Sequence, residues 1–347
     1  MRRRIQRRKI RVLRSSLLAG AFLALVVSRE AAAQTPNVEQ VIGDFGFPAN
    51  ASERLRRGEV LEADPAESSD RELAVGLTFL VKEPPATVAK AFRKAVDLQE
   101  DSQLAASMPL RGAGALADFA TLVLAPDGAA EAKRYVSARP GETLNLSPDE
   151  IRAFDALATA SDQPVRQVED QLRQMLLARY RSYLASGLDG IPPYARSGGL
   201  LEPSKELRGA LEAAAPLLGN YAPAMLQLLR TYPRDKPVDL KESFYWLRYD
   251  LDGRPNYTLR HRLALPVGST AVVADREFYV SHGYNTSQAI SGLIPVPEGT
   301  VVFYRSRVST DQVAGFGSSV KKGIGRGVMA KQLMEIFKRS RASFQQH

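Results

Sequence analysis

Strict alternation of apolar and polar side chains is the feature that most narrows the folds open to this chain. Four segments in its last third show it: ESFYWLRYDL (242–251), NYTLRHRLAL (256–265), TAVVADREFYVSHGY (270–284) and TVVFYRSRV (300–308). A period of two is typical of β-strands. Turn-forming residues lie at 252–255 and 297–299, as antiparallel neighbours require. We therefore expect an antiparallel meander with one buried and one solvated face.

A further strand of this kind is predicted far upstream. Residues 72–82, ELAVGLTFLVK, alternate in the same way and end before Pro84-Pro85. Apolar residues from Val88 to Val96 then recur at the spacing of a helix. Residues 118–125 and 133–138 are predicted as two more strands.

The middle of the chain, from 147 to about 232, has helical periodicity. Ser147-Pro148-Asp149-Glu150 is a helix start, since serine caps, proline suits the first turn and glutamate reaches back to the cap. Gly187 ends the longest periodic run, and Pro233 and Pro237 mark the return to period two. We expect these helices to form a subdomain.

A last helix is expected up to about Ser343, with an apolar stripe and an excess of basic residues. The basic residues considered for contact with anionic lipid are Lys321, Lys322, Arg326, Lys331, Lys338 and Arg339. A solvated face with cations near a helix C-terminus explains the same pattern. The preceding Gly315–Ser319 lacks the third glycine of a dinucleotide loop, so a helix cap is the better interpretation.

Together these segments resemble the START/Bet v 1-like, helix-grip family. VKEPPATVAKAF looks like its first strand and following helix, and PEGTVVFYRSRVSTD with the basic helix looks like its last strand and closing helix. The resemblance covers about half of the chain after residue 33. It implies an α+β fold in which a curved antiparallel sheet and a long C-terminal helix enclose a cavity for a lipid-like molecule. The helical middle departs from this pattern, and would be an insertion or a lid.

The N-terminus has the three parts of a secretory signal. A basic start (residues 1–14) precedes an apolar run (15–27) and a small-residue site at Ala31–Ala33. The apolar run is shorter than the roughly 20 residues of a spanning helix. We expect cleavage between Ala33 and Gln34, export, and a periplasmic or extracellular location. An uncleaved anchor is the alternative.

The net charge of the chain comes mostly from the signal-like residues 1–33. The whole chain has 47 basic and 38 acidic residues, for a net charge of +9. Nine basic residues and one acid lie in residues 1–33, so the rest is nearly neutral. The basic balance therefore does not support a nucleic-acid partner.

The composition also limits the chemistry. The chain has no cysteine and three histidines. Disulfides, thiolate metal sites and cysteine nucleophiles are therefore excluded, and neither a metal site nor a cofactor is expected.

Five residues are candidates for ligand contact. Tyr245, Tyr249 and Tyr257 would line one concave surface, because amphipathic rings suit a mostly apolar ligand with one polar end. His261 and His282 fall on apolar strand faces, where they would contact a head group or act as an acid or base. Packing in a filled core explains the tyrosines equally well, and a buried histidine that is hydrogen-bonded to the backbone or to tyrosine is the favoured interpretation of His261 and His282.

The expected organisation is a signal segment (1–33), an α+β segment supplying a strand and a helix to the sheet (34–146), a helical subdomain (147–236) and the meander with its final helix (237–347). The favoured function is binding of an apolar or amphipathic small molecule in the envelope. The alternatives are a structural or interaction protein with a filled core, and an enzyme of the same fold that uses His261 or His282.

Overall fold

The computed structural model describes residues 35–89, 104–141, 143–157, 164–267 and 270–315, with short pieces between 321 and 334. The predicted signal, the cleavage site at Ala33 and Gln34, and most of the two helices expected after 89 and after 320 lie outside these residues.

One eight-stranded antiparallel sheet forms the centre of the molecule, with the strand order β1-β2-β10-β9-β8-β7-β6-β3. Its strands are β1 (Leu61–Ala63), β2 (Glu72–Val81), β3 (Leu104–Leu110), β6 (Lys241–Leu251), β7 (Arg254–Val267), β8 (Thr270–Val280), β9 (Thr286–Val296) and β10 (Gly299–Ser309). A separate hairpin joins β4 (Tyr194–Arg196) to β5 (Gly199–Leu201). The α+β fold with a large antiparallel sheet is as predicted.

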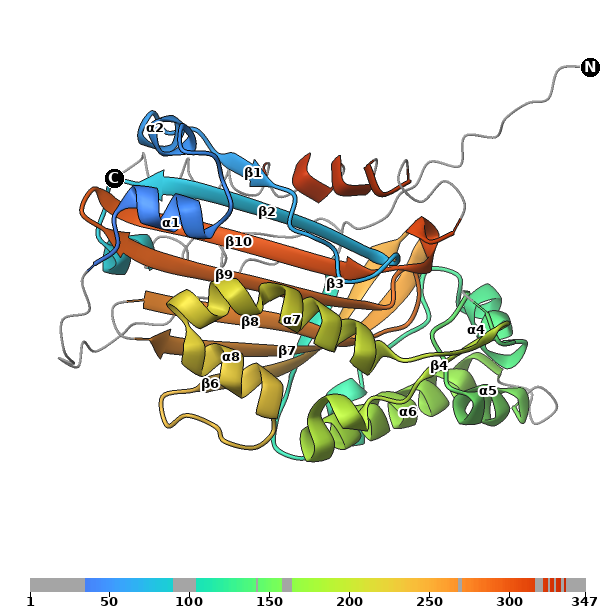
Figure 1. The fold of residues 1–347 in the computed structure, drawn as a ribbon. Coiled ribbons are helices and arrows are strands. Elements are labelled where there is room, and N and C mark those ends of the chain that lie inside the picture. The colour runs from blue at the N-terminus through green and yellow to red at the C-terminus, as the bar shows by residue number, and fades with distance from the viewer. Residues whose placement is uncertain are drawn as a thin grey trace, which may run out of the picture.

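Helices lie in front of this sheet, at its lower right and beside its upper edge in Figure 1. They are α1 (Val38–Asp44), α2 (Ala51–Arg56), α4 (Gly128–Val136), α5 (Pro148–Asp155), α6 (Pro164–Ser186), α7 (Pro203–Tyr221) and α8 (Pro223–Thr231). Short 3-10 turns lie at Leu116–Phe119, Gly187–Gly190 and Asp311–Val313. The helical middle and the cap at Ser147 are confirmed, with both hydrogen bonds of the capping box present.

The early strand and the late strands belong to the same sheet, as expected. β2 pairs with β10 along its whole length, from Glu72 opposite Ser309 to Val81 opposite Thr300. The segment 34–146 supplies three strands rather than one, because β3 also joins the sheet beside β6. Strand β9 was not predicted. Its sequence, TSQAISGLIPV, contains glycine and proline and does not alternate clearly.

Two predicted strands are wrong. Residues 118–125 form a 3-10 turn and loop, and residues 133–138 lie mostly in α4. The side chain of Asp127 caps α4 by accepting from the amide of Ala130. Local capping therefore decided the structure where a short apolar run was ambiguous.

The sheet has a helix face, which carries Phe244, His261, Phe278 and Phe303, and a far face, which carries Tyr249, Arg260, Tyr304 and Leu73. The register defines these two sets. The expectation of a solvated face is wrong, since far-face residues such as Arg260 (3% exposed) and Ser306 (0%) are buried. A described piece of the C-terminal segment lies on the far face, because a Cβ at Gly325 would be 2.9 Å from Leu73 Cδ1.

Candidate functional site

The far face holds a buried polar cluster centred on an ion pair between neighbouring strands. Arg260 of β7 donates from Nη2 to Glu277 Oε1 of β8 at 2.6 Å and to the Tyr249 hydroxyl of β6 at 2.6 Å. The Tyr284 hydroxyl donates to the other oxygen of Glu277 at 2.7 Å. All four residues are at most 3% exposed. The alternation of the strands places them together on one face.

A second ion pair lies beside the first. Arg262 Nε donates to Asp275 Oδ1 at 2.8 Å, and its Nη2 donates to Oδ2 at 3.2 Å. Asp275 lies opposite Ala289, and Ala289 lies opposite Ser306. Ser306 of β10 therefore lies on the same face of the sheet as the Asp275 carboxylate, two strands away.

Within the part of the chain that the structure describes, three buried polar atoms of this far-face cluster are under-satisfied: the Tyr304 and Ser306 hydroxyls have at most each other as partners, and Nε of Arg260 has none. Buried polar groups are nearly always satisfied, so such atoms call for an explanation. Leaving one unsatisfied costs about 1–3 kcal/mol. A group that bound here would remove that cost.

The charges of the cluster balance internally. Burial works against the Arg260 guanidinium, yet Tyr249 and Glu277 outweigh it, so the pKa of Arg260 is raised. Burial raises the pKa of the Glu277 carboxyl, and Arg260 opposes that shift only in part. Burial also raises the pKa of the Tyr304 hydroxyl, with the neighbouring Ser306 hydroxyl acting in the opposite direction. Both hydroxyls are therefore neutral at physiological pH.

The five sequence-predicted ligand residues do not share one surface. Tyr249 belongs to the far-face cluster, and Tyr245 lies on the same face, half-buried. Tyr257 lies on the helix face, where its hydroxyl donates to the Val123 carbonyl at 2.6 Å. The expectation that the three tyrosines line one concave surface is wrong, because the register places Tyr257 opposite Arg248 rather than in line with Tyr245.

His261 is at the centre of a buried array on the helix face. Its Nδ1 and the Tyr183 hydroxyl share a hydrogen bond of 3.0 Å, and its Nε2 lies 3.1 Å from Glu242 Oε1. Its ring stacks on Phe244 at 4.2 Å between centroids. Burial lowers the pKa of His261 to about 4, and Glu242 opposes this only in part. Both nitrogens face protein groups, so neither is free for a substrate.

His282 follows β8 rather than lying within it. It is 6% exposed, and its Nε2 lies 3.1 Å from the Pro255 carbonyl. Burial lowers its pKa to about 4, with Arg254 adding to the effect. Like His261, it packs in the core, and the two histidines do not meet on one surface.

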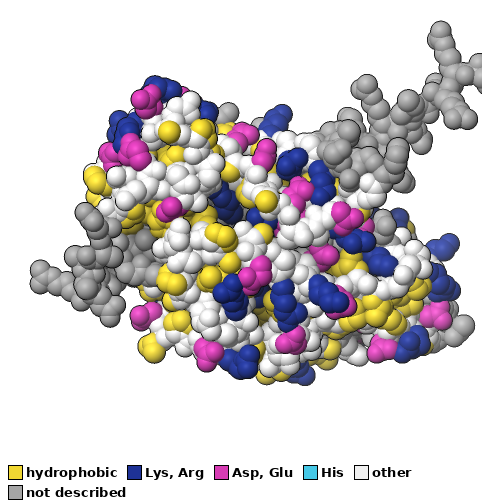
Figure 2. Space-filling model, in the orientation of Figure 1, with side chains coloured by type: hydrophobic (Ala, Val, Ile, Leu, Met, Phe, Trp, Pro, Cys, Tyr) yellow, Lys and Arg dark blue, Asp and Glu magenta, His cyan; other side chains and the backbone are white. Residues whose placement is uncertain are grey.

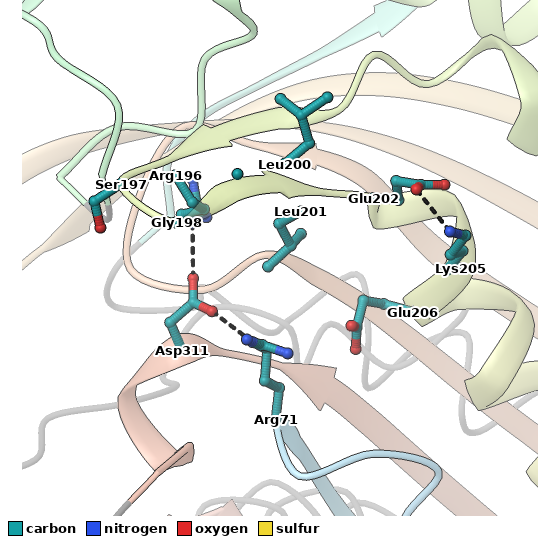
Figure 3. Close-up of a pocket in the computed structure, with 11 residues that line it drawn as sticks. Arg71, Arg196, Ser197, Gly198, Leu200, Leu201, Glu202, Lys205, Glu206 and Asp311 are labelled. Atoms are coloured by element: carbon teal, nitrogen blue, oxygen red, sulfur yellow. Dashed lines mark hydrogen bonds and ion pairs between the residues drawn. The ribbon is translucent and has the colours of Figure 1, made fainter.

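A pocket of about 420 Å³ opens beside the β4–β5 hairpin. It is lined by Arg71, Arg196, Asp311, Lys205, Glu206 and the consecutive residues Ser197–Glu202. In Figure 3, Arg71, Leu201 and Glu206 point toward its centre from the loop before β2, from β5 and from α7. Asp311 joins Arg71 and Arg196 through ion pairs of 2.9 and 3.0 Å.

Basic residues of the C-terminal segment are partly engaged. Lys322 pairs with Glu67 at 2.7 Å, and Arg326 lies 3.9 Å from the same carboxylate. Lys338 and Arg339 lie outside the described residues. On the side shown in Figure 2, basic and acidic side chains are intermingled over the surface.

The described part of the chain contains no group of three or more His, Asp or Glu side chains placed to hold a metal ion. The helices in this part include none with the length and apolar character needed to cross a bilayer.

Apart from Tyr249, the residues of the far-face cluster are not among the sequence-predicted site residues. Arg260 and Arg262 alternate with apolar residues, and their pattern predicts a solvated face. The signal that could have found them is the alternation of opposite charges within β8, where Asp275 and Glu277 share the far face. Ion pairing across strands permits such charges to be buried.

No protein-family model, no curated protein and no solved structure matches this chain.

Proposed function

We propose that this protein is an exported carrier that binds an amphipathic small molecule with an uncharged polar head on the far face of its sheet. The observation that supports this most directly is a group of buried, under-satisfied polar atoms on that face: among the described residues, the Tyr304 and Ser306 hydroxyls have at most each other and Arg260 Nε has no partner. The signal-like N-terminus supports the export part of the proposal.

Apolar side chains surround the polar cluster on the same face. They are Val75, Leu77, Phe79, Val273, Leu293 and Val302. Ligand sites of this kind are mostly apolar with a few polar groups that fix orientation. Burial of a hydrocarbon chain contributes about 25 cal/mol per Å², and the polar cluster would set the position of the head.

The charge balance favours a neutral head. Arg260 and Arg262 are each paired with a carboxylate, at 2.6 and 2.8 Å. A charged head would therefore be buried without a counter-ion, which is costly. A hydroxyl, carbonyl or amide can bond to the Tyr304 and Ser306 hydroxyls and to Arg260 Nε at no such cost.

Native mass spectrometry of the chain after residue 33 tests the proposal. The protein purified from its producing cells should carry a bound mass that organic extraction releases, and the stripped protein should bind a long-chain alcohol. Tyr304→Phe removes one hydroxyl and should weaken that binding about tenfold, the loss of roughly one hydrogen bond.

Tyr135→Phe is the matched control. It deletes another buried, under-satisfied hydroxyl, which lies on α4 and has at most Ser281 as a partner among the described residues, and should leave binding unchanged. If the purified protein carries no extra mass and the stripped protein binds no alcohol, or if both variants bind alike, the proposal is wrong.

A further inference from the structure

The β4–β5 hairpin has one engaged edge and one edge to which no backbone group in the described part of the chain bonds. On the β4 side, the amide of Ala195 donates to the Leu146 carbonyl at 2.8 Å, and the Ala195 carbonyl accepts from Gly141 at 3.1 Å. Both polar groups of Ala195 therefore point away from β5.

Leu200 is the antiparallel partner of Ala195. In an antiparallel ladder, the two residues of a pair either bond to each other or both point outward. Because Ala195 points outward, the amide and carbonyl of Leu200 point outward on the other side of the hairpin. Leu200 is 59% exposed.

The open edge of β5 borders the pocket beside the hairpin. Ser197–Glu202 line it consecutively, so a ligand can follow the strand. An unpaired strand edge is a template for another extended chain.

Opposite charges lie across the pocket from this edge. Glu206 accepts from Ser69 and Ser309 through Oε2 alone, which leaves Oε1 free among the described contacts. Arg71 bonds Asp311 through Nε, its Nη1 lies 3.6 Å from Asp70 Oδ1, and its Nη2 has no partner within the described part of the chain. The pocket thus offers one anionic acceptor and one cationic donor (Figure 3).

We propose that this pocket binds an extended peptide segment of another protein, which adds as a strand to β5 and carries one acidic and one basic group. The segment pairs with the amide and carbonyl of Leu200. Its acidic group faces Arg71, and its basic group faces Glu206. Strand addition supplies affinity through the main chain, and the charged pair supplies selectivity. This site is separate from the far face of the sheet.

Selection from a phage-displayed library of random nonapeptides, with the chain after residue 33 as bait, tests the proposal. The enriched peptides should be extended in character and contain both an acid and a base. Calorimetry with one synthetic peptide then compares two variants. Leu200→Pro removes the outward amide without touching the pairing to β4, and should weaken binding at least tenfold. Leu200→Val keeps the amide and should bind like the wild type.

Hydrogen exchange provides an independent readout on the unaltered chain. The Leu200 amide should exchange at least tenfold more slowly with peptide bound. This measurement does not need the Leu200→Pro variant, so it tests the proposal even if that variant is unstable. The proposal is overturned if no peptide is enriched, if the proline variant binds as tightly as the wild type, or if the Leu200 amide gains no protection.

Discussion

Gly76 of β2 leaves the space that the side chain of Arg305 occupies on the neighbouring strand. A Cβ at residue 76 would lie 2.2 Å from Arg305 Nη1 and 2.7 Å from its Cδ. Arg305 is 8% exposed, and its guanidinium lies 5.0 Å from the centroid of the Phe45 ring. No carboxylate pairs with it among the described residues, and burial lowers its pKa to about 10.

Replacing this unpaired cation should stabilise the protein. Arg305→Met keeps the length of the side chain and removes a buried charge, so we expect the free energy of unfolding to rise by about 1–3 kcal/mol. Chemical denaturation measures it. Gly76→Ala should cost about 1–3 kcal/mol through overpacking, and less in the Arg305→Met background. A lower stability for Arg305→Met would show that the contact with Phe45 outweighs the cost of burial.

Stability should fall as the solution is acidified below neutral pH. His261 and His282 both have a pKa of about 4 in the folded protein, lowered mainly by burial. Unfolded histidine titrates near 6.5. Between pH 6.5 and 4 the unfolded chain therefore binds protons that the folded chain does not, and each histidine removes roughly 3 kcal/mol across that window.

Denaturation at several pH values measures this effect. His261→Gln and His282→Gln should each flatten the dependence of stability on pH between 6.5 and 4, whatever they do to stability at pH 8. An unchanged slope in both variants would mean that other groups cause the acid sensitivity.

Glu131 of α4 connects the helical layer to the β6–β7 turn. It is 1% exposed, accepts from Arg254 at 2.7 and 3.1 Å, and pairs with Arg134 at 2.9 Å. Glu131→Gln leaves two cations without their carboxylate and should cost about 3–5 kcal/mol. Thermal unfolding measures the change.

Glu212→Gln is the control for that experiment. Glu212 also accepts two hydrogen bonds from one arginine, Arg230, but its side chain is 57% exposed. Water replaces such a partner readily, so the melting temperature should stay unchanged. Equal effects at residues 131 and 212 would contradict the role given to burial.

The cap of α5 should contribute measurably to stability. The Ser147 hydroxyl accepts from the Glu150 amide at 3.3 Å, while Glu150 accepts from the Ser147 amide at 2.7 Å. Ser147→Ala should cost about 1 kcal/mol, and Ser147→Asp should retain most of the wild-type stability. Equilibrium unfolding compares the two. Equal losses in both variants would mean that packing, rather than capping, holds this helix end.

The sequence predicts this fold well where a local rule decides the structure. The alternation in 242–265 predicts β6 and β7, the capping box predicts the start of α5, and Gly187, with a φ of 59°, ends α6. Strand β9 is not predicted, because its apolar and polar residues do not alternate with a clear period. Residues 133–136 are assigned to a strand because Asp127, the cap that starts α4, lies outside the apolar run.

The candidate site is harder to predict, because it depends on which face of the sheet is buried by other parts of the protein. Alternation groups Tyr249 with Tyr245 within one strand and separates Arg260 from Tyr257 within the next, but only the register of β6 with β7 places Arg260 on the face of Tyr245, and alternation does not say that this face is buried. Likewise, the charged groups around the hairpin pocket come from Arg71, Glu206 and Asp311, which are distant in the sequence. Arg71 precedes β2 and Asp311 follows β10, so only the pairing of these two strands brings them together.

That same pairing sets the order in which the sheet can be completed. During synthesis, β2 emerges more than 200 residues before the strand that it pairs with along its full length. At a synthesis rate of 5–20 residues per second, the apolar residues of β2 remain unpaired with β10 for on the order of ten seconds or longer. Contacts so far apart along the chain form slowly. The apolar residues of β2 therefore stay without their longest strand pairing until the last strand of the sheet has been made.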